Sequence, residues 1–438
     1  MEMSINTTSL ENRLLAIKRS ARKLFSTPTE QKNQILEAIA DRLIKNTDRI
    51  LSANSDDLTN LDPKRPASFA DRLLLNKQRI ESMATSIRAV ASLPDPVGEI
   101  VENRTLENGL KIKRVRSPLG AVLMIFESRP NVITEVFSLA FKSGNAIVLR
   151  GGRESKHTAQ VVYEIIGETL KSELPIEPPF MGIEDYDRGL VGELLKRNDI
   201  FDVCIPRGGT ELIERVSKES RMPVLKNDKG ICHVYVHETA DLEMARRILI
   251  NAKTQRPAVC NAAETLLIDQ AIAKGGLARL IPSLHDHGVR FFCCSASYQL
   301  LQQIAKTDGS QSPWSQAIEP AVESGAESHF LREHLDLILN VRIVKDLDMA
   351  LEHIEQFGSK HSEAIIANNE SVARRFQAEV DSACVYWNAS TRFTDGFTLG
   401  LGGEIGISTQ KLHVRGPVGL RDLTIPRWII DGQGQIRE

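Results

Sequence analysis

The chain lacks the features that mark membrane, secreted and nucleic-acid-binding proteins. Over 438 residues its formal net charge is −2, so no global field favours nucleic acid or an anionic membrane. No run of roughly 18 apolar residues occurs, which excludes a transmembrane helix. The polar segment from Met1 to Ser20 has no apolar core. We therefore expect no secretory signal and a cytoplasmic protein.

Cysteine and aromatic residues are also scarce. The six cysteines show no CxxC spacing and no dense framework, and aromatic residues make up only 5% of the chain. This pattern indicates reduced cytosolic thiols rather than disulfides or a zinc site, and we predict no metal. The adjacent Cys293 and Cys294 follow an apolar run and are interpreted as a buried strand end. The composition and length suit a globular protein of two or three domains.

The N-terminal quarter of the chain is predicted to be helical and to end in a hairpin. Apolar residues recur at helical spacing from about 10 to 55 and from about 68 to 91. Residues 99–116 then alternate around Asn108-Gly109, a hairpin signal, with basic arms that we interpret as a solvated edge. The stretch Leu423–Ile430 is predicted to be a lone strand that could pair with this hairpin and support dimerisation.

From Pro118 the pattern changes to buried strands that alternate with helices. A first group of strands is expected at 121–126, 146–149 and 202–205, and a second at 234–236, 265–268, 290–292, 338–344, 364–366 and 384–387. Such alternation predicts an α/β fold with two doubly wound parallel-sheet domains. Ligands of such sheets bind at the carboxyl ends of the strands, and a cleft between the two domains is the expected active site.

Two glycine pairs follow strands of the first group. Arg150-Gly151-Gly152-Arg153 ends one strand, and Gly208-Gly209 ends another, each directly before a helix. Glycine lets the backbone approach a phosphate, while the helix start and the guanidiniums favour anions. Each turn alone could be an ordinary connection with surface arginines, and the GxGxxG fingerprint is absent. Together they indicate a nucleotide-diphosphate site.

Cys260 is the candidate nucleophile. It follows the basic turn around Arg256 and Pro257 and precedes the apolar run from Thr265 to Ile268. Positive charge near an accessible thiol favours the thiolate. The alternative is that Cys260 is a small buried hydrophobic residue, which is common for a cysteine outside a disulfide.

Two other stretches allow a functional and a structural interpretation. Asn131 follows the first parallel strand, where it could cap the next helix or donate to an oxyanion. The tract from Asn388 to Gly406, which includes Ser390 and Thr391, could be a substrate-gripping loop or a return connection.

The motifs of the chain, taken in order, resemble the gamma-glutamyl phosphate reductase family of the aldehyde dehydrogenase superfamily. The resemblance rests on Ser117–Gly120, Glu127–Val132, Lys142–Ala146, Arg150–Gly152, Pro206–Gly209, Ala252–Pro257, Val259–Leu267 and Glu404–His413. It spans essentially the whole chain. Ala258 departs from the usual Gly or Ser, and Phe397-Thr398-Leu399 departs from the usual Gly-Glu-Phe. Neither change removes a reacting group.

The resemblance assigns roles by position. Cys260 matches the nucleophile, and Asn131 matches the oxyanion-side asparagine. The cofactor residues it implies are Arg150, Gly151, Gly152 and Arg153 at the adenosine ribose, Gly208 and Gly209 at the pyrophosphate, and Glu333 at the nicotinamide ribose. The substrate residues it implies are Arg129, Arg256, Ser390 and Thr391. Arg153 stands where relatives that prefer NAD often carry Glu, so NADPH is the expected cofactor.

The resemblance also implies a reaction and a domain plan. The expected reaction is reduction of L-glutamate 5-phosphate to the 5-semialdehyde through a Cys260 thioester, in a homodimer or higher oligomer that could partner glutamate 5-kinase. A hydrolytic aldehyde dehydrogenase and a catalytically silent partner subunit remain alternatives. The expected segments are 1–103 with 117–232 for NADPH, 233–384 for the thiol, 104–116 with 420–438 for oligomerisation, and 385–419 for the substrate loop and return connection.

Overall fold

The computed structural model describes residues 2–65, 67–226, 229–307 and 312–437. The chain divides into two compact units, each assembled from separate segments. Unit 1 comprises Met1–Lys226, Gly400–Gly406 and Pro417–Glu438, and unit 2 comprises Asn227–Leu399 and Ile407–Gly416. No helix in the described ranges is long and apolar enough to cross a membrane.

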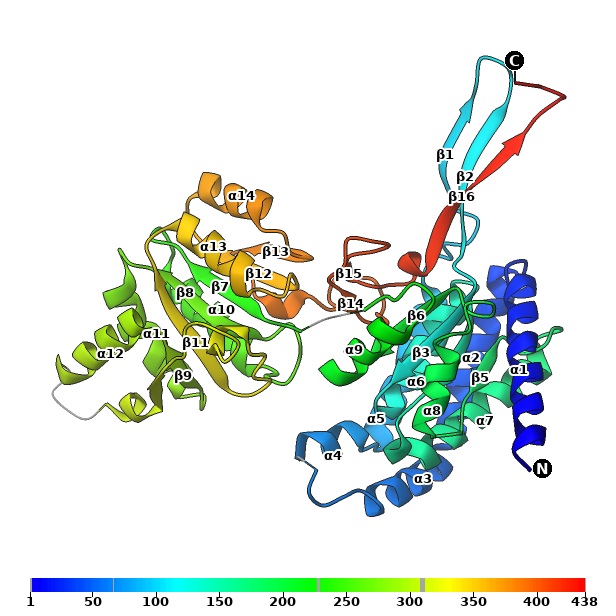
Figure 1. The fold of residues 1–438 in the computed structure, drawn as a ribbon, viewed down its shortest axis with the longest axis horizontal. Coiled ribbons are helices and arrows are strands. Elements are labelled where there is room, and N and C mark those ends of the chain that lie inside the picture. The colour runs from blue at the N-terminus through cyan, green and yellow to red at the C-terminus, as the bar shows by residue number, and fades with distance from the viewer. Residues whose placement is uncertain (1, 66, 227–228, 308–311, 438) are drawn as a thin grey trace. The chain divides into compact units, whose positions relative to one another are not determined.

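Unit 1 is built on a four-stranded parallel sheet in the order β5-β4-β3-β6 (Figure 1). Its strands are β3 (Ala121–Phe126), β4 (Ala146–Arg150), β5 (Phe180–Gly182) and β6 (Val203–Arg207). Every residue of β3 is buried, which explains its uninterrupted apolar sequence, because a parallel sheet is covered on both faces. Apolar residues of the N-terminal helix, including Leu14 and Ile17, pack into the core of this sheet.

Helices surround the sheet of unit 1. They are α1 (Glu2–Leu24), α2 (Thr29–Lys45), α3 (Thr47–Thr59), α4 (Ala67–Leu73), α5 (Lys77–Ser92), α6 (Pro130–Lys142), α7 (Lys156–Glu173), α8 (Arg188–Leu194) and α9 (Thr210–Glu219), with the 3-10 turn η1 (Arg153–Ser155) before α7. The predicted helical stretch from about 10 to 55 is therefore three helices. Breaks fall at the N-cap residues Pro28 and Asn46.

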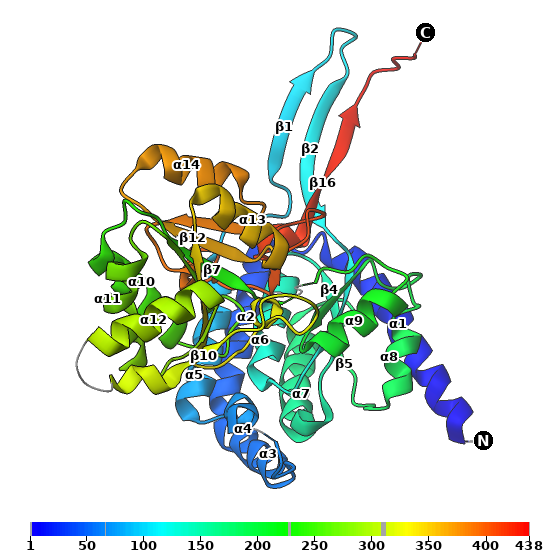
Figure 2. The ribbon, with the colours of Figure 1, turned by 60° about the vertical axis from the view of Figure 1, so that its left-hand side comes forward.

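The predicted hairpin and the predicted lone strand pair as expected. Strands β1 (Ile100–Thr105), β2 (Lys111–Pro118) and β16 (Thr424–Asp431) form an antiparallel sheet in the order β1-β2-β16, seen as a long ribbon in Figures 1 and 2. Gly109 adopts a φ of +84° at its turn, a conformation that suits glycine. Lys111, Lys113 and Arg114 of its basic arms are at the surface, as predicted. Arg116 is mostly buried, with 18% of its side chain exposed, and pairs with Glu99.

Unit 2 contains a seven-stranded parallel sheet in the order β10-β9-β11-β8-β7-β12-β13. Its strands are β7 (Cys232–Val236), β8 (Ala263–Asp269), β9 (Arg290–Cys293), β10 (Ile318–Pro320), β11 (Ile338–Val344), β12 (Ser362–Ile366) and β13 (Cys384–Trp387). Its helices are α10 (Leu242–Thr254), α11 (Ala273–His285), α12 (Ser295–Thr307), α13 (Leu347–Phe357) and α14 (Glu370–Glu379). Two short strands, β14 (Ile407–Ser408) and β15 (Gly416–Pro417), and the 3-10 turns η2 (Pro313–Ala317), η3 (His329–Leu331), η4 (Thr391–Phe393) and η5 (Arg421–Leu423) complete the chain.

The sheet of unit 2 buries both faces, which accounts for its strand sequences. Val234 and Val236 of β7 pack in one core cluster with residues of α10, α11 and α12. Tyr235, between them, packs in another with residues of α13 and α14. Successive residues of a strand point to opposite faces of the sheet. A strand that is covered by helices on both faces therefore has a continuous apolar sequence.

The structure confirms the predicted fold class and most predicted strands, but it divides the chain differently. All of β7 belongs to unit 2, so the boundary lies at 226/227 rather than at 232/233, because β7 pairs with β8 and β12. The expected connection 385–419 is shared between the units. Cys293 and Cys294 are buried at the end of β9, as predicted.

Candidate functional site

Cys260 lies in the turn between α10 and β8, and Gly230 packs directly against its backbone. A Cβ atom added at Gly230 would lie 2.0 Å from the carbonyl oxygen of Cys260, so only glycine fits there. The Sγ of Cys232 donates to the same carbonyl at 3.2 Å, and burial raises the pKa of the Cys232 thiol and keeps it protonated. Cys260 itself is partly exposed, so it is not the buried hydrophobic residue of the alternative interpretation.

The residues around Cys260 gather at the amino ends of the strands of unit 2. Gly230 and Cys260 each come a few residues before the first residue of a parallel strand, β7 and β8 respectively. Glu333 precedes β11, and its carboxylate accepts the Gly230 amide at 2.9 Å. Burial raises the pKa of Glu333, although that hydrogen bond acts in the opposite direction. The general rule that ligands bind at carboxyl ends therefore does not describe the edge that carries this thiol.

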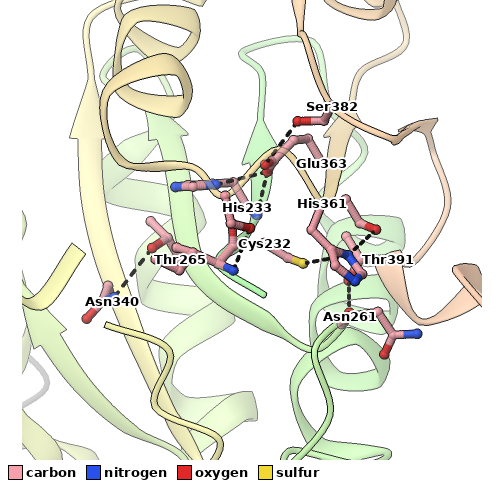
Figure 3. Close-up of polar contacts among 12 residues, drawn as sticks. Cys232, His233, Asn261, Thr265, Asn340, His361, Glu363, Ser382 and Thr391 are labelled. Carbon is pink, nitrogen blue, oxygen red and sulfur yellow. Dashed lines mark hydrogen bonds and ion pairs between the residues drawn. The ribbon is translucent and has the colours of Figure 1, made fainter. Parts of the chain in front are cut away.

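The segment after β13 is fastened to the turn of Cys260 through Asn261. The Thr391 hydroxyl donates to the Asn261 carbonyl at 2.7 Å (Figure 3), and the Asn261 amide donates to the Thr394 carbonyl at 2.7 Å. Ser390 caps η4 by accepting the amide of Arg392 at 3.2 Å. The predicted substrate residues Ser390 and Thr391 are both buried, and these bonds give their hydroxyls a role in shaping the turn.

Arg392 is a residue near the thiol that the sequence reasoning missed. Its guanidinium donates to the side-chain oxygens of Asn261 and Gln255, the latter at 2.9 Å. The predicted substrate residue Arg256 is exposed in the same turn. Arg392 stands next to Thr391 in the tract already singled out, but nothing in its spacing distinguishes it from a surface arginine.

Behind the thiol, unit 2 holds a buried polar network. Glu264, in β8, pairs with Lys253 at 3.2 Å with both side chains fully buried. Burial raises the pKa of Glu264 to about 7 and lowers that of Lys253, so this carboxylate is part of the core. His233 and Glu363, also buried, lie 2.9 Å apart, as Figure 3 shows.

The predicted cofactor residues of unit 1 gather at one edge of its sheet. β3, β4 and β6 run parallel, so Arg150-Gly151-Gly152-Arg153 and Gly208-Gly209 both follow carboxyl ends at that edge. Arg150 is partly buried beside the ring of Tyr186, and burial lowers the pKa of its guanidinium. Arg153 is exposed at the start of η1. Turns of this kind, which combine backbone amides with guanidiniums, can hold an anionic ligand.

The two glycine turns pack closely against the loop after β3. A Cβ atom at Gly152 would lie 2.2 Å from the Ser128 hydroxyl oxygen, and one at Gly208 would lie 2.7 Å from the Glu127 side chain. A larger residue at either position would therefore displace the Ser128 or Glu127 side chain. The Glu127 carboxylate accepts the Gly209 amide. Helix α9 starts without a side-chain cap at Gly209, so an anion can be held at its first turn.

Asn131 and Arg129 lie in the same loop and the helix that follows it. Arg129 is the N-cap of α6, Pro130 is its first residue, and Asn131 is the second. The interpretation of Asn131 as the cap is therefore wrong, because Pro130 takes the first helical position, which its fixed φ favours. The Asn131 side chain is exposed. It is thus available for a ligand.

The predicted site residues therefore fall into two groups. Unit 2 brings Cys260, Arg256, Ser390, Thr391 and Glu333 to one neighbourhood, and unit 1 does the same for the glycine turns with Arg129 and Asn131. Among the described residues, no group of three or more His, Cys, Asp or Glu side chains could hold a metal ion.

Comparison with known proteins defines the class of this fold. No protein-family model matches the chain. The structure is similar to that of an acetylating aldehyde dehydrogenase from Geobacillus thermoglucosidasius, with a TM-score of 0.70 over 98% of each chain at 19% identity. Two parallel-sheet units, one with a cysteine turn and the other with glycine turns, thus form an aldehyde dehydrogenase-like fold.

Two nearer relatives narrow the class to a family. The chain is 46% identical to gamma-glutamyl phosphate reductase of Carboxydothermus hydrogenoformans over 425 residues, 96% of this chain and 97% of that one. The crystal structure of gamma-glutamyl phosphate reductase from Thermotoga maritima matches with a TM-score of 0.91 and 40% identity, over 98% of this chain and all of that one. The chain belongs to the gamma-glutamyl phosphate reductase family, and is therefore an oxidoreductase.

Proposed function

We propose that the protein catalyses the NADPH-dependent reduction of L-glutamate 5-phosphate to L-glutamate 5-semialdehyde and phosphate, the second step of proline biosynthesis from glutamate. The observation that carries this proposal is the turn of Cys260, held by Gly230, Cys232 and Thr391 through backbone contacts that leave the thiol partly exposed. The names of the relatives support the substrate.

In this mechanism the Cys260 thiolate attacks the acyl carbon, and phosphate leaves as the thioester forms. A backbone N–H near Cys260 would hold the oxyanion, and the resemblance of the sequence to the family assigns the same role to the exposed amide of Asn131. When bound, a nicotinamide cofactor would supply the hydride equivalent for the reduction, and Cys260 would leave as the thiolate when the aldehyde is released. Holding the turn by backbone contacts keeps the thiol in one position, which is what a covalent step requires.

The glycine turns of unit 1 fit a dinucleotide in their chemistry. Arg150 and Arg153 would hold the adenosine ribose and its phosphate, and the uncapped start of α9 at Gly208-Gly209 would hold the pyrophosphate. A guanidinium at position 153 suits the 2′-phosphate of NADPH. The Glu127 carboxylate, which now accepts the Gly209 amide, must release that amide to the pyrophosphate. In unit 2, Glu333 would accept hydroxyls of the nicotinamide ribose.

The sheet β1-β2-β16 is the proposed oligomerisation surface. It exposes large apolar side chains, among them Trp428 at 50% and Ile430 at 57%. A second copy that covered these strands would bury apolar area that one chain leaves in water. A homodimer or a higher homo-oligomer follows from this proposal, and sedimentation of the Trp428→Glu variant tests it.

The experiment that tests the reaction is run in the oxidative direction. An acyl-phosphate reductase releases its thioester to phosphate, so NADPH formation from glutamate 5-semialdehyde should rise with phosphate and saturate. The product should be an acyl phosphate, which hydroxylamine traps as a hydroxamate. Fast oxidation in phosphate-free buffer with free glutamate as product would instead support a hydrolytic aldehyde dehydrogenase. The absence of turnover in both directions would support a catalytically silent partner subunit.

A further inference from the structure

Arg392 is a half-buried cation beside the thiol, and neutral groups hold it. Its Nε donates to the Gln255 side-chain oxygen at 2.9 Å, and its Nη1 donates to that of Asn261, the residue after Cys260. Across the described ranges, no carboxylate forms an ion pair with Arg392. Two other arginines of unit 2 differ in this respect: Arg415 pairs with Asp381 at 2.7 Å, and Arg375 pairs with two carboxylates.

A second cation stands in the turn to which Arg392 is bonded, because Arg256 directly follows Gln255, whose side chain accepts the Arg392 Nε at 2.9 Å. Burial lowers the pKa of the Arg392 guanidinium, and the charge of Arg256 lowers it further, while Asp395 and Cys260 act in the opposite direction. The two guanidiniums therefore repel one another. A guanidinium that is fixed by neutral acceptors, with a second cation in the same turn, can form a site for an oxyanion, because an anion relieves the repulsion and accepts several charge-assisted hydrogen bonds.

We propose that Arg392 and Arg256 bind the phosphate group of the acyl-phosphate substrate, with Arg392 as the fixed half of the site and Arg256 as the exposed half. This inference rests on the proposed function. In an acyl phosphate, the phosphate is attached to the carbon that the thiol attacks, so it must lie beside Cys260. The α-carboxylate of the substrate lies further away, by the length of the glutamate side chain.

The proposed phosphate site serves acyl transfer between phosphate and Cys260 in both directions. In the reductive direction the sulfur–carbon bond forms, the carbon–oxygen bond to phosphate breaks, and the leaving phosphate takes the electron pair of that bond and one proton to become HPO₄²⁻. In the oxidative direction an oxygen of HPO₄²⁻ forms a bond to the acyl carbon, the thiolate leaves, and one proton is released. Two guanidiniums stabilise the leaving anion in one direction and orient the attacking anion in the other.

A chemical assay tests the anion site without cofactor or substrate. Iodoacetate is an anion and iodoacetamide is neutral, but both alkylate the same thiolate, so the ratio of their rates at Cys260 cancels the thiolate fraction. Peptide mass mapping follows Cys260 alone among the six cysteines. We expect inorganic phosphate to slow the iodoacetate reaction in the wild type. In Arg392→Gln, the ratio of the iodoacetate rate to the iodoacetamide rate should fall about tenfold or more, because one charge-assisted hydrogen bond, on the order of 1.5–3 kcal/mol, is lost.

Three variants make the assay specific. Arg256→Gln changes an exposed side chain, so it keeps the test valid even where Arg392→Gln folds poorly. Arg392→Lys retains the charge but lacks the planar guanidinium, so its ratio of alkylation rates should lie between those of the wild type and Arg392→Gln. Arg374→Gln removes an exposed arginine of α14 that pairs with Glu370, and should leave the ratio unchanged.

Kinetics then identify the anion. In semialdehyde oxidation we expect Arg392→Gln and Arg256→Gln to raise the KM for phosphate about tenfold and to leave the KM for the semialdehyde unchanged. A rise in the KM for the semialdehyde alone would assign the pair to the α-carboxylate and overturn the proposal, and so would an unchanged alkylation ratio in both variants. A wild type that needs no phosphate would refute the proposed function, whereas the alkylation ratio reports the anion site independently.

Discussion

Gly230→Ala is the change for which the structure predicts the largest effect from a single methyl group. The added Cβ would lie 2.0 Å from the Cys260 carbonyl oxygen and 2.5 Å from its Cα, both backbone atoms that cannot rotate away. Real Cβ atoms essentially never lie closer than 3.0 Å to such an atom, so the Cβ and the Cys260 carbonyl oxygen would have to move apart by at least 1.0 Å. A misplacement of about 1 Å costs roughly 10²-fold in rate, and overpacking costs about 1–3 kcal/mol of stability.

The assay measures kcat for semialdehyde oxidation with saturating phosphate, and urea unfolding measures stability in the same preparation. The matched control is Gly275→Ala in α11, where an added Cβ meets nothing within 4 Å. That control should keep wild-type kcat and gain roughly 0.5–1 kcal/mol, since alanine favours a helix. If Gly230→Ala retained a kcat within threefold of the wild type, the close packing at Gly230 would not be what positions the thiol.

Further predictions concern the nucleophile, the cofactor and the buried core. Cys260→Ser should abolish turnover yet unfold at the wild-type urea concentration, whereas Cys293→Ser should change stability only; activity above a few per cent in the first variant would exclude Cys260 as the attacking group. Arg153→Glu should weaken NADPH and spare NADH, measured as the ratio of their kcat/KM values; an unchanged ratio would place the ribose turn elsewhere. Because burial raises the pKa of Glu264 to about 7 from 4.5, the folded chain keeps a proton that the unfolded chain has lost. The contribution of Glu264 to the free energy of unfolding should therefore fall as pH rises from 4.5 to about 7. In Glu264→Gln this part of the pH dependence of the free energy of unfolding should disappear.

Much of the fold could be predicted because both sheets are parallel and buried on both faces. A strand such as Ala121–Phe126 is a continuous apolar run, and its bounds are the predicted ones. The elements that were missed lack this signal. β5 has only three residues, Phe180–Gly182, and α12 buries only Ser297, Leu301 and Ile304 along an otherwise polar sequence. Such elements are stabilised by neighbours that are distant in sequence.

The candidate site was predictable where its chemistry depends on residue type. It was unpredictable where it depends on contacts between residues that are far apart in the sequence. A cysteine after a basic turn is visible in the sequence. The contact of Gly230 with Cys260 joins residues thirty positions apart, and the hydrogen bond from Arg392 to Asn261 spans 131. Neither has a periodicity or a motif of its own. The interpretation of Asn131 as a cap failed for a local reason, because Pro130 occupies the first position of α6.

The charges around Cys260 also bear on the choice between phosphate and water. Hydrolysis needs a general base beside the thioester. Three carboxylates of unit 2 lie near this turn, and each is engaged: Glu264 pairs with buried Lys253 at 3.2 Å, Glu333 accepts the Gly230 amide at 2.9 Å, and Asp395 accepts the Thr398 amide at 3.0 Å. The cations Arg256 and Arg392, by contrast, belong to this turn or are hydrogen-bonded to it. Phosphate is already an anion at neutral pH, so cations attract it and it needs no base. A neutral water molecule gains no comparable attraction from these cations. The arrangement therefore favours exchange with phosphate.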